Sequence, residues 1–262
     1  MIPYGRQDIT QEDIDTVISV LRSDWLTQGP KVPEFERAVA SYCGANHAVS
    51  VNSATSALHI ACLALDLVPG DWLWTSPNTF VASANAALYC GAKVDFVDID
   101  PRTYNMSVER LKEKLEQAEK EGRLPKIVMP VHFAGQPCEM PAIHALSQKY
   151  GFKIIEDASH AIGASYNDIK VGSCVHSHIT VFSFHPVKMI TTGEGGVATT
   201  NRIDLSDSLK RFRSHGIDYQ EVPRSIEEAE EIWNYRLIEL GYNYRMTDLA
   251  AALGCSQMLR LT

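Results

Sequence analysis

The chain of 262 residues lacks the features that mark several whole classes of protein. It has no run of about 18 apolar residues, so the sequence predicts no transmembrane helix. Residues 1–6 contain no basic segment followed by an apolar stretch, so no signal peptide is predicted. Basic residues number 24 against 32 acidic ones, for a net charge of -8. Such a balance does not suit a protein that binds the phosphates of a nucleic acid.

Paired cysteines are also missing. None of the six cysteines belongs to a CxxC pair, and their spacing is not that of a disulfide framework. In a chain of this length we expect reduced thiols and a cytoplasmic protein. Cys174, His176 and His178 are metal-ligand types, but they crowd into one segment without a second pair. That spacing favours a loop, and the sequence predicts no metal site.

Several signature motifs of other enzyme classes are absent as well. No GxGxxG follows an expected strand, and the turn at 193–196 lacks the Gly-Lys-Ser/Thr of a P-loop. Ser183 and His185 do not form the GxSxG turn of a hydrolase. Nucleotide binding of these kinds and serine hydrolysis are therefore not predicted.

The segments that are present alternate between strand and helix patterns. Strands are expected at 48–52, 72–75, 93–98, 126–132, 153–156, 180–184 and 196–200. Helices are expected at 11–22, 56–65, 79–89, 107–121, 140–150, 225–239 and 247–261, with a loop at 24–33. Most of the strands are continuously apolar, which is typical of strands buried on both faces. The alternation predicts an α/β fold with a mostly parallel central sheet flanked by helices.

Ligands of such sheets bind at the carboxyl ends of the strands. Residues 53–56, Ser-Ala-Thr-Ser, open the helix after the first strand. They could offer N–H and hydroxyl groups to a phosphate, or serve as a plain helix cap. Phe80 follows the next strand and could stack on a flat ring or belong to the core.

The third and fourth candidates follow later strands. Asp157 could pair with a protonated ring nitrogen or cap the next segment. Lys188 lies past an apolar strand, where burial would lower its pKa and free a nucleophilic amine; Ser183 nearby could donate to a phosphate. Together with residues 53–56 and Phe80, these groups supply what pyridoxal 5′-phosphate (PLP) requires.

Four segments in order carry a family resemblance. They are NSATSALH at 52–59, EDASHA at 156–161, SFHPVK at 183–188 with TGEGG at 192–196, and GYNYRMTD at 241–248. From about residue 3 to residue 261 the chain resembles the DegT/DnrJ/EryC1/StrS family of sugar aminotransferases. The resemblance implies a PLP-dependent transferase of fold type I, similar to aspartate aminotransferase. It also implies an N-terminal segment at 1–25 and a PLP-binding large domain at 26–262, with the family's small C-terminal domain absent.

The resemblance assigns roles around the cofactor. Lys188 would carry the Schiff base and move protons, Asp157 would bind the pyridinium nitrogen, and His160 would lie near the ring. Ala54, Thr55 and Ser183 would hold the phosphate, and Phe80 would stack on the ring. Asn243 would reach the phosphate in the neighbouring subunit, so the resemblance implies a homodimer with a shared site.

Roles toward the substrates follow in the same way. Residues 24–30 and 185–188 look most like the branch of the family that acts in pseudaminic acid biosynthesis. That branch aminates C4 of a UDP-linked 4-keto-6-deoxy-N-acetylhexosamine, with L-glutamate as amino donor. The nucleotide sugar would contact Tyr4, Trp25, Leu26, Thr27, Gln28 and Ser56, and Arg245 would receive a carboxylate of glutamate.

The expected activity is that of a nucleotide-sugar transaminase, EC class 2.6.1. One alternative is a sugar 3-dehydratase of the same family, in which histidine replaces the lysine; Lys188 argues against it, although His185 lies close by. A second alternative is a truncated, catalytically silent protein that binds PLP, which the missing small domain would explain.

Overall fold

The computed structural model describes residues 5–218 and 235–261 of the chain. Its centre is a seven-stranded sheet with the order β1-β9-β8-β5-β4-β2-β3. The strands are β1 (His47–Val51), β2 (Trp72–Thr75), β3 (Lys93–Phe96), β4 (Ile127–Met129), β5 (Lys153–Asp157), β8 (Ile179–Ser183) and β9 (Gly196–Thr200). Only β9 runs antiparallel to its neighbours, β1 and β8, while the other adjacent pairs are parallel. The predicted α/β fold with a mostly parallel sheet is confirmed.

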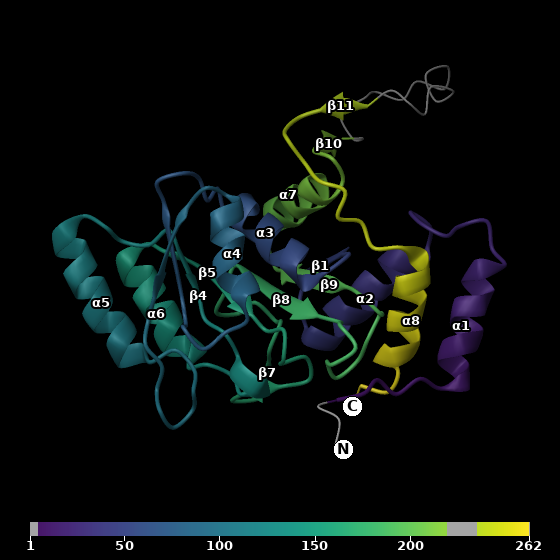
Figure 1. Ribbon diagram of the computed structural model, residues 1–262, viewed down its shortest axis with the longest axis horizontal. Coiled ribbons are helices and arrows are strands. Elements are labelled where there is room, and N and C mark those ends of the chain that lie inside the picture. The colour runs from purple at the N-terminus through teal and green to yellow at the C-terminus, as the bar shows by residue number, and fades with distance from the viewer. Residues whose placement is uncertain (1–4, 219–234, 262) are drawn as a thin grey trace.

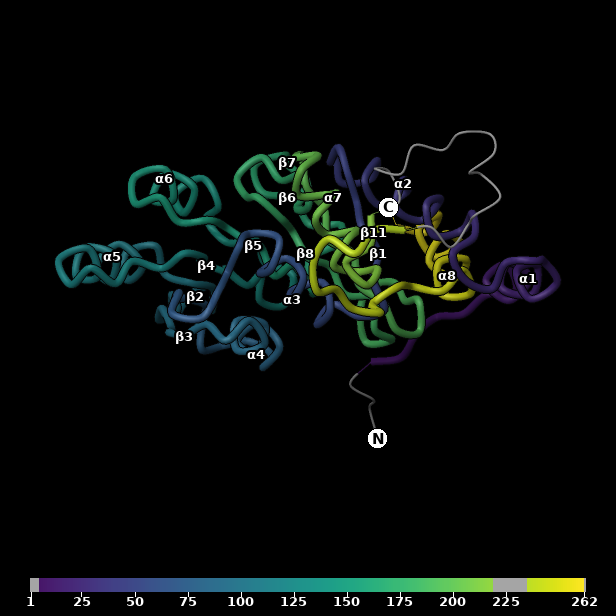
Figure 2. Tube along the Cα trace, turned by 90° about the horizontal axis from the view of Figure 1, so that it is seen from above, coloured from purple at the N-terminus to yellow at the C-terminus, as the bar shows by residue number. Residues whose placement is uncertain are grey.

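Helices cover both faces of this sheet. They are α1 (Gln11–Leu21), α2 (Lys31–Cys43), α3 (Ala54–Ala64), α4 (Val81–Tyr89), α5 (Val108–Glu121), α6 (Met140–Tyr150), α7 (Ile203–Arg213) and α8 (Asp248–Met258). Figure 1 shows α5 and α6 at one end of the molecule and α1 and α8 at the other. Figure 2 shows α4 and α6 on opposite sides of β4 and β5. Short elements complete the description: η1 (Phe133–Gly135), β6 (Ser165–Tyr166), β7 (Ile169–Lys170), β10 (Ile217–Asp218) and β11 (Arg236–Leu237).

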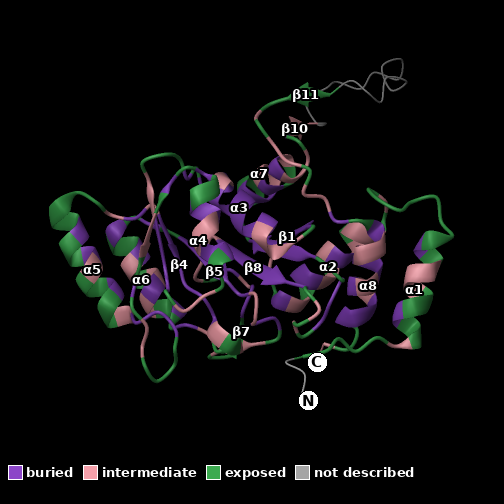
Figure 3. Cartoon of the chain, viewed as in Figure 1, coloured by how far each residue is buried: buried purple, intermediate pink, exposed green. Residues whose placement is uncertain are grey.

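Most of the strands are apolar on both faces because each face meets a different group of helices; the edge strand β3 is an exception, with a charged residue at Lys93 and at Asp95. In β4, Ile127 and Met129 pack in the cluster formed with α3, α4 and α7, whereas Val128 packs in the cluster formed with α5 and α6. Successive side chains of a strand point to opposite faces, so the side chains on both faces of the strand are buried. The sheet is accordingly buried throughout most of its length, while the outer sides of α1 and α5 are exposed (Figure 3).

The elements expected from the sequence differ from the structure in several places. The loop expected at 24–33 ends where α2 begins at Lys31, and Pro33 lies inside the first turn of that helix. Proline is tolerated there because the N–H groups of a first turn have no partner within the helix. Helices α2 and α7 were not predicted at all. Of the helix expected at 225–239, residues 225–234 lie outside the described part, and Arg236–Leu237 form strand β11 rather than helix.

No helix among the described residues is long and apolar enough to cross a bilayer. The expected division of the chain at residue 25 and the expected absence of a small domain stay predictions.

Candidate active site

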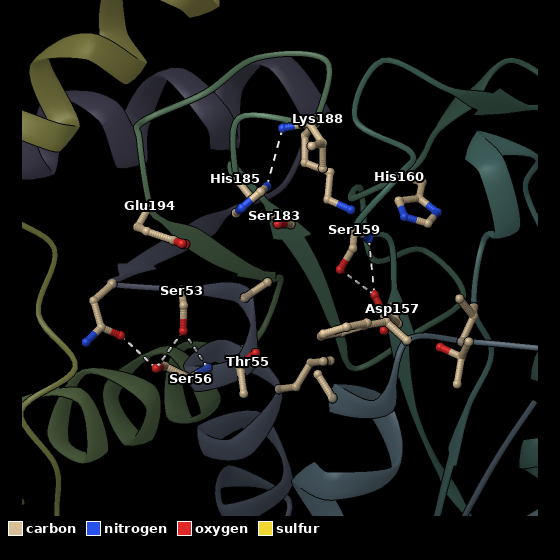
Figure 4. Close-up of a pocket in the computed structure, with 18 of the residues that line it drawn as sticks. Ser53, Thr55, Ser56, Asp157, Ser159, His160, Ser183, His185, Lys188 and Glu194 are labelled. Atoms are coloured by element: carbon tan, nitrogen blue, oxygen red, sulfur yellow. Dashed lines mark hydrogen bonds between the residues drawn. The ribbon is translucent and has the colours of Figure 1, made fainter. Parts of the chain in front are cut away.

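A cavity of about 710 Å³ opens beside the carboxyl ends of β1, β2, β5 and β8. Its volume is in the range of small-molecule sites. The structure brings eight of the predicted site residues together in its lining: Ala54, Thr55, Ser56, Phe80, Asp157, His160, Ser183 and Lys188. Figure 4 shows Lys188, His160 and Asp157 on one side of the cavity and the start of α3 on the other.

The start of α3 forms an anion-binding cradle. The Ser53 side chain caps the helix by accepting a hydrogen bond from the Ser56 N–H at 3.1 Å. The N–H groups of Ala54 and Thr55 lie in the first turn, where no intrahelical acceptor exists, and they suit an anion. Strand β9 approaches this turn so closely that a Cβ on Gly196 would lie 2.5 Å from the Ala54 nitrogen. Glycine is required at this position because any side chain would strike the backbone of the cradle.

Ser56 makes its hydrogen bonds within the same helix start. Its hydroxyl donates to the Asn52 side-chain oxygen at 2.6 Å and lies 2.9 Å from the Ser53 hydroxyl. Figure 4 shows Ser53 and Ser56 side by side at the start of α3. The residue lines the cavity, but its exposed fraction is only 8%. Its expected contact with a nucleotide sugar stays a prediction.

Lys188 is carried by the segment 184–195, which joins β8 to β9. The two ends of the segment are joined, because the Phe184 N–H donates to the Gly195 carbonyl at 2.9 Å, and the Thr192 N–H donates to the Phe184 carbonyl at 3.0 Å. The Lys188 N–H donates to the His185 carbonyl at 2.9 Å. Burial lowers the pKa of Lys188, and the nearby charge of Asp157 only partly opposes that effect. A lysine of this kind gives up its proton more readily than a surface lysine and is then a nucleophile.

Asp157 ends β5, and the residue is only 4% exposed. Its Oδ1 accepts hydrogen bonds from the Ser159 N–H at 3.2 Å and the Ser159 hydroxyl at 2.6 Å. Its Oδ2 accepts from the Ser83 hydroxyl of α4 at 2.6 Å. Burial also lowers the pKa of His160, Lys188 lowers it further, and Asp157 opposes both effects. His160 is therefore predominantly neutral near pH 7.

Phe80 immediately precedes α4, and its ring is not part of the core. The residue is 73% exposed and lines the cavity. An aromatic ring in such a position offers a face against which a flat ligand can stack.

A buried cluster behind Asp157 was not predicted from the sequence. Glu156 points to the opposite face of β5, where it accepts hydrogen bonds from His132 Nε2 at 2.7 Å, Thr180 Oγ1 at 2.8 Å and the Ser177 hydroxyl. Burial alone would raise the pKa of Glu156, but these hydrogen bonds outweigh it and lower the pKa. The His132 N–H also donates to the Asp157 carbonyl at 3.0 Å, so the cluster fixes the end of β5.

The remaining predicted residues do not line this cavity. Trp25, Leu26, Thr27, Gln28, Asn243 and Arg245 lie elsewhere in the described chain, and Tyr4 lies outside the described residues. Gln28 and Arg245 line a second cavity of about 500 Å³ together with Glu36 and Arg213. Their expected ligand contacts stay predictions, and within one subunit Arg245 does not share a cavity with Lys188.

The geometry of the cavity agrees with the sequence comparison. A sequence profile of the DegT/DnrJ/EryC1/StrS aminotransferase family matches residues 7–262. The chain belongs to this family. The UDP-4-amino-4,6-dideoxy-N-acetyl-beta-L-altrosamine transaminase of Campylobacter jejuni is 44% identical over 262 residues, which are 100% of this chain and 65% of that protein. The spore coat polysaccharide biosynthesis protein SpsC of Bacillus subtilis is 40% identical over 99% of this chain and 64% of its own length.

Solved structures of the family are also similar. Helicobacter pylori PseC, an aminotransferase of pseudaminic acid biosynthesis, matches with a TM-score of 0.88 and 32% identity over 99% of this chain and 65% of that one. The sugar aminotransferase Spr1654 of Streptococcus pneumoniae, solved in its PMP form, matches with a TM-score of 0.85 and 30% identity. It covers 99% of this chain and 68% of its own. The chain thus spans somewhat less than two thirds of the length of the curated relatives.

Proposed function

We propose that this chain holds PLP in the 710 Å³ cavity and acts as a nucleotide-sugar aminotransferase. The reaction would convert a UDP-linked 4-keto-6-deoxy sugar to its 4-amino form, with L-glutamate as the amino donor. One observation carries the proposal: a buried lysine, a buried carboxylate and a helix N-terminus line the same cavity. The Campylobacter and Helicobacter proteins named above support the choice of substrate class.

The residues present fit the cofactor by their chemistry. The start of α3 offers N–H groups to a phosphate, and the missing side chain of Gly196 lets β9 approach that helix start without displacing it. Asp157 offers a carboxylate to a ring nitrogen, Phe80 offers a stacking face, and Lys188 offers an amine.

Bound PLP supplies an aldehyde that condenses with amines and a ring that takes up electrons. The chain's own residues supply binding and proton transfer. The N–H groups of Ala54 and Thr55 bind the phosphate, with the Ser183 hydroxyl as a further donor. Asp157 holds a proton at the ring nitrogen. Lys188 is the amine nucleophile, and because burial lowers the pKa of its amine, Nζ gives up a proton more readily than a surface lysine and can move protons at the reacting carbon. A neutral His160 beside it adds no competing positive charge.

The substrate side would be completed by a second copy of the chain. Asn243 is exposed and lies outside the cavity, so its expected phosphate contact requires the neighbouring subunit. Arg245, which would receive a carboxylate of glutamate, is half-buried and also lies outside this cavity. We therefore propose a homodimer with a shared site, in which Tyr4 and residues 25–28 contact the nucleotide sugar. The cytoplasmic location expected from the cysteines stays a prediction.

The first test is the visible spectrum of the purified chain with PLP. The imine that PLP forms with a lysine absorbs visible light at a wavelength on the order of 420 nm. Lys188→Ala should abolish this absorbance, whereas Lys153→Ala, at the opposite end of β5, should leave it unchanged. An unchanged spectrum in Lys188→Ala would contradict the assignment of the amine.

A second test separates the aminotransferase from a silent PLP-binding protein. L-glutamate added to the yellow holoprotein should transfer its amine and bleach the visible band in a single turnover. A stable band despite bound PLP would favour the silent alternative. The 3-dehydratase alternative is disfavoured because the cavity presents Lys188, and not a histidine, at this position.

A further inference from the structure

The carboxylate of Asp157 is almost saturated by neighbouring donors. A carboxylate offers about four lone-pair positions, two on each oxygen. The N–H and the hydroxyl of Ser159 take both positions on Oδ1, at 3.2 Å and 2.6 Å. The hydroxyl of Ser83 takes one position on Oδ2, at 2.6 Å. One acceptor position is left, and it belongs to the oxygen that Ser83 holds.

The direction of the hydrogen bonds around Ser83 follows from its single proton. An ionised carboxylate can only accept hydrogen bonds, so the Ser83 hydroxyl donates its single proton to Asp157 Oδ2. The Thr79 hydroxyl lies 2.7 Å from the Ser83 oxygen and must then donate to it. The Phe80 carbonyl, 3.3 Å from the same oxygen, is a competing acceptor for the Ser83 proton. The donation from Thr79 favours the orientation of Ser83 that points its proton at Asp157.

The first turn of α4 therefore positions both Phe80 and the hydrogen bond to Asp157. Ser83 lies in the first turn of α4, is fully buried and donates its N–H to the Phe80 carbonyl at 3.2 Å. Phe80, which lines the cavity, directly precedes that turn. The stacking face and the contact on Oδ2 are thus fixed relative to each other by the start of one helix.

We propose that Ser83, supported by Thr79, is a positioning residue that holds Asp157 so that Oδ2 accepts the ring N–H of the cofactor. The proposal rests on the proposed function, because it presumes a ring nitrogen at Asp157. It assigns the contact to one oxygen of the carboxylate, and it makes the strength of the contact depend on a residue that does not line the cavity.

The test compares two ligands that differ only at the ring nitrogen. PLP and 1-deazapyridoxal 5′-phosphate, in which a carbon replaces that nitrogen, are titrated into the apoprotein, and dissociation constants are measured by quenching of tryptophan fluorescence. Ser83→Ala should weaken PLP roughly tenfold and the deaza analogue less than about twofold, because only PLP depends on the orientation of Asp157. Thr79→Val should weaken PLP by about threefold with the same selectivity.

The control is Ser206→Ala, which removes another fully buried helical serine whose hydroxyl has no hydrogen-bond partner. It should leave both constants unchanged. Equal losses for the two ligands in Ser83→Ala and in Thr79→Val, or no loss at all, would overturn the role of Ser83. Thr79 is only half-buried, so its variant keeps the test open if Ser83→Ala does not fold. If the unaltered protein bound both ligands equally well, the contact between Asp157 and the ring nitrogen would itself be refuted.

Discussion

The substitution Gly196→Ala probes the phosphate cradle directly. A Cβ at this position would lie 2.5 Å from the Ala54 nitrogen and 2.6 Å from the carbonyl carbon and oxygen of Ser53. Ordinary van der Waals contact begins at 3.4 Å, and all three neighbours are backbone atoms that cannot rotate away. The start of α3 would therefore have to retreat from β9 by about 1 Å.

Two costs follow from this displacement. Overpacking of a buried site destabilises the fold by about 1–3 kcal/mol. A shift of the Ala54 and Thr55 N–H groups also lengthens their contacts with the phosphate. Loss of one hydrogen bond to a charged group costs about 1.5–3 kcal/mol, which corresponds to roughly tenfold to a hundredfold in the dissociation constant of PLP.

The assay measures PLP affinity and unfolding in parallel, with Gly151→Ala as the control. Gly151 ends α6 with φ of 80° and has open space around the position of a Cβ, so alanine there strains the backbone without reaching the cavity. It should lower stability by roughly 1 kcal/mol and leave PLP binding unchanged. If Gly196→Ala bound PLP as tightly as the unaltered protein, the cradle would not be where we describe it.

Three further predictions concern pH and stacking. Because the pKa of Lys188 lies below 10.5, capture of PLP by the apoprotein should rise with pH and reach half its maximum below pH 10.5; a midpoint at or above that value would contradict the burial of the amine. The folded-state pKa of Glu156 lies below 4.5, so its contribution to stability is present above about pH 4.5 and is lost as pH falls through the folded pKa. Glu156→Gln should cost roughly 1–3 kcal/mol at pH 7 and flatten this acid limb in urea unfolding, and an equally steep limb would refute its role. Phe80→Ala should weaken PLP by about twofold to tenfold, measured by the same titration, and an unchanged constant would exclude stacking.

The groups that line the cavity could be predicted because each lies at the end of a strand or shortly after it. Asp157 ends its strand, and Lys188 and the helix start at 53–56 follow strands whose apolar runs are visible in the sequence. The topology of a parallel sheet then brings the strand ends to one edge. The limits of β2 and β9 coincide with the expected ones for the same reason.

The partners of those groups could not be predicted in this way. Ser83 lies on a helix far from Asp157 in sequence, and its apolar neighbours suggest only a small residue on a buried face. Glu156 and His132 come together only through the register of β4 and β5. Helix α2 was missed altogether: Pro33 favours a loop, but its usual meaning as a helix breaker does not apply in a first turn.

The place of β9 in the sheet has a consequence for how the protein folds. Ser183 of β8 pairs with Gly196 of β9 across the short segment that carries Lys188, whereas Gly196 pairs on its other side with Val51, from the first strand of the sheet. Closing a short loop costs less chain entropy than closing a long one, and local contacts form sooner. We expect the hairpin with the reactive amine to form early and the anion cradle to form late. Only molecules that have completed this later closure could then retain the cofactor.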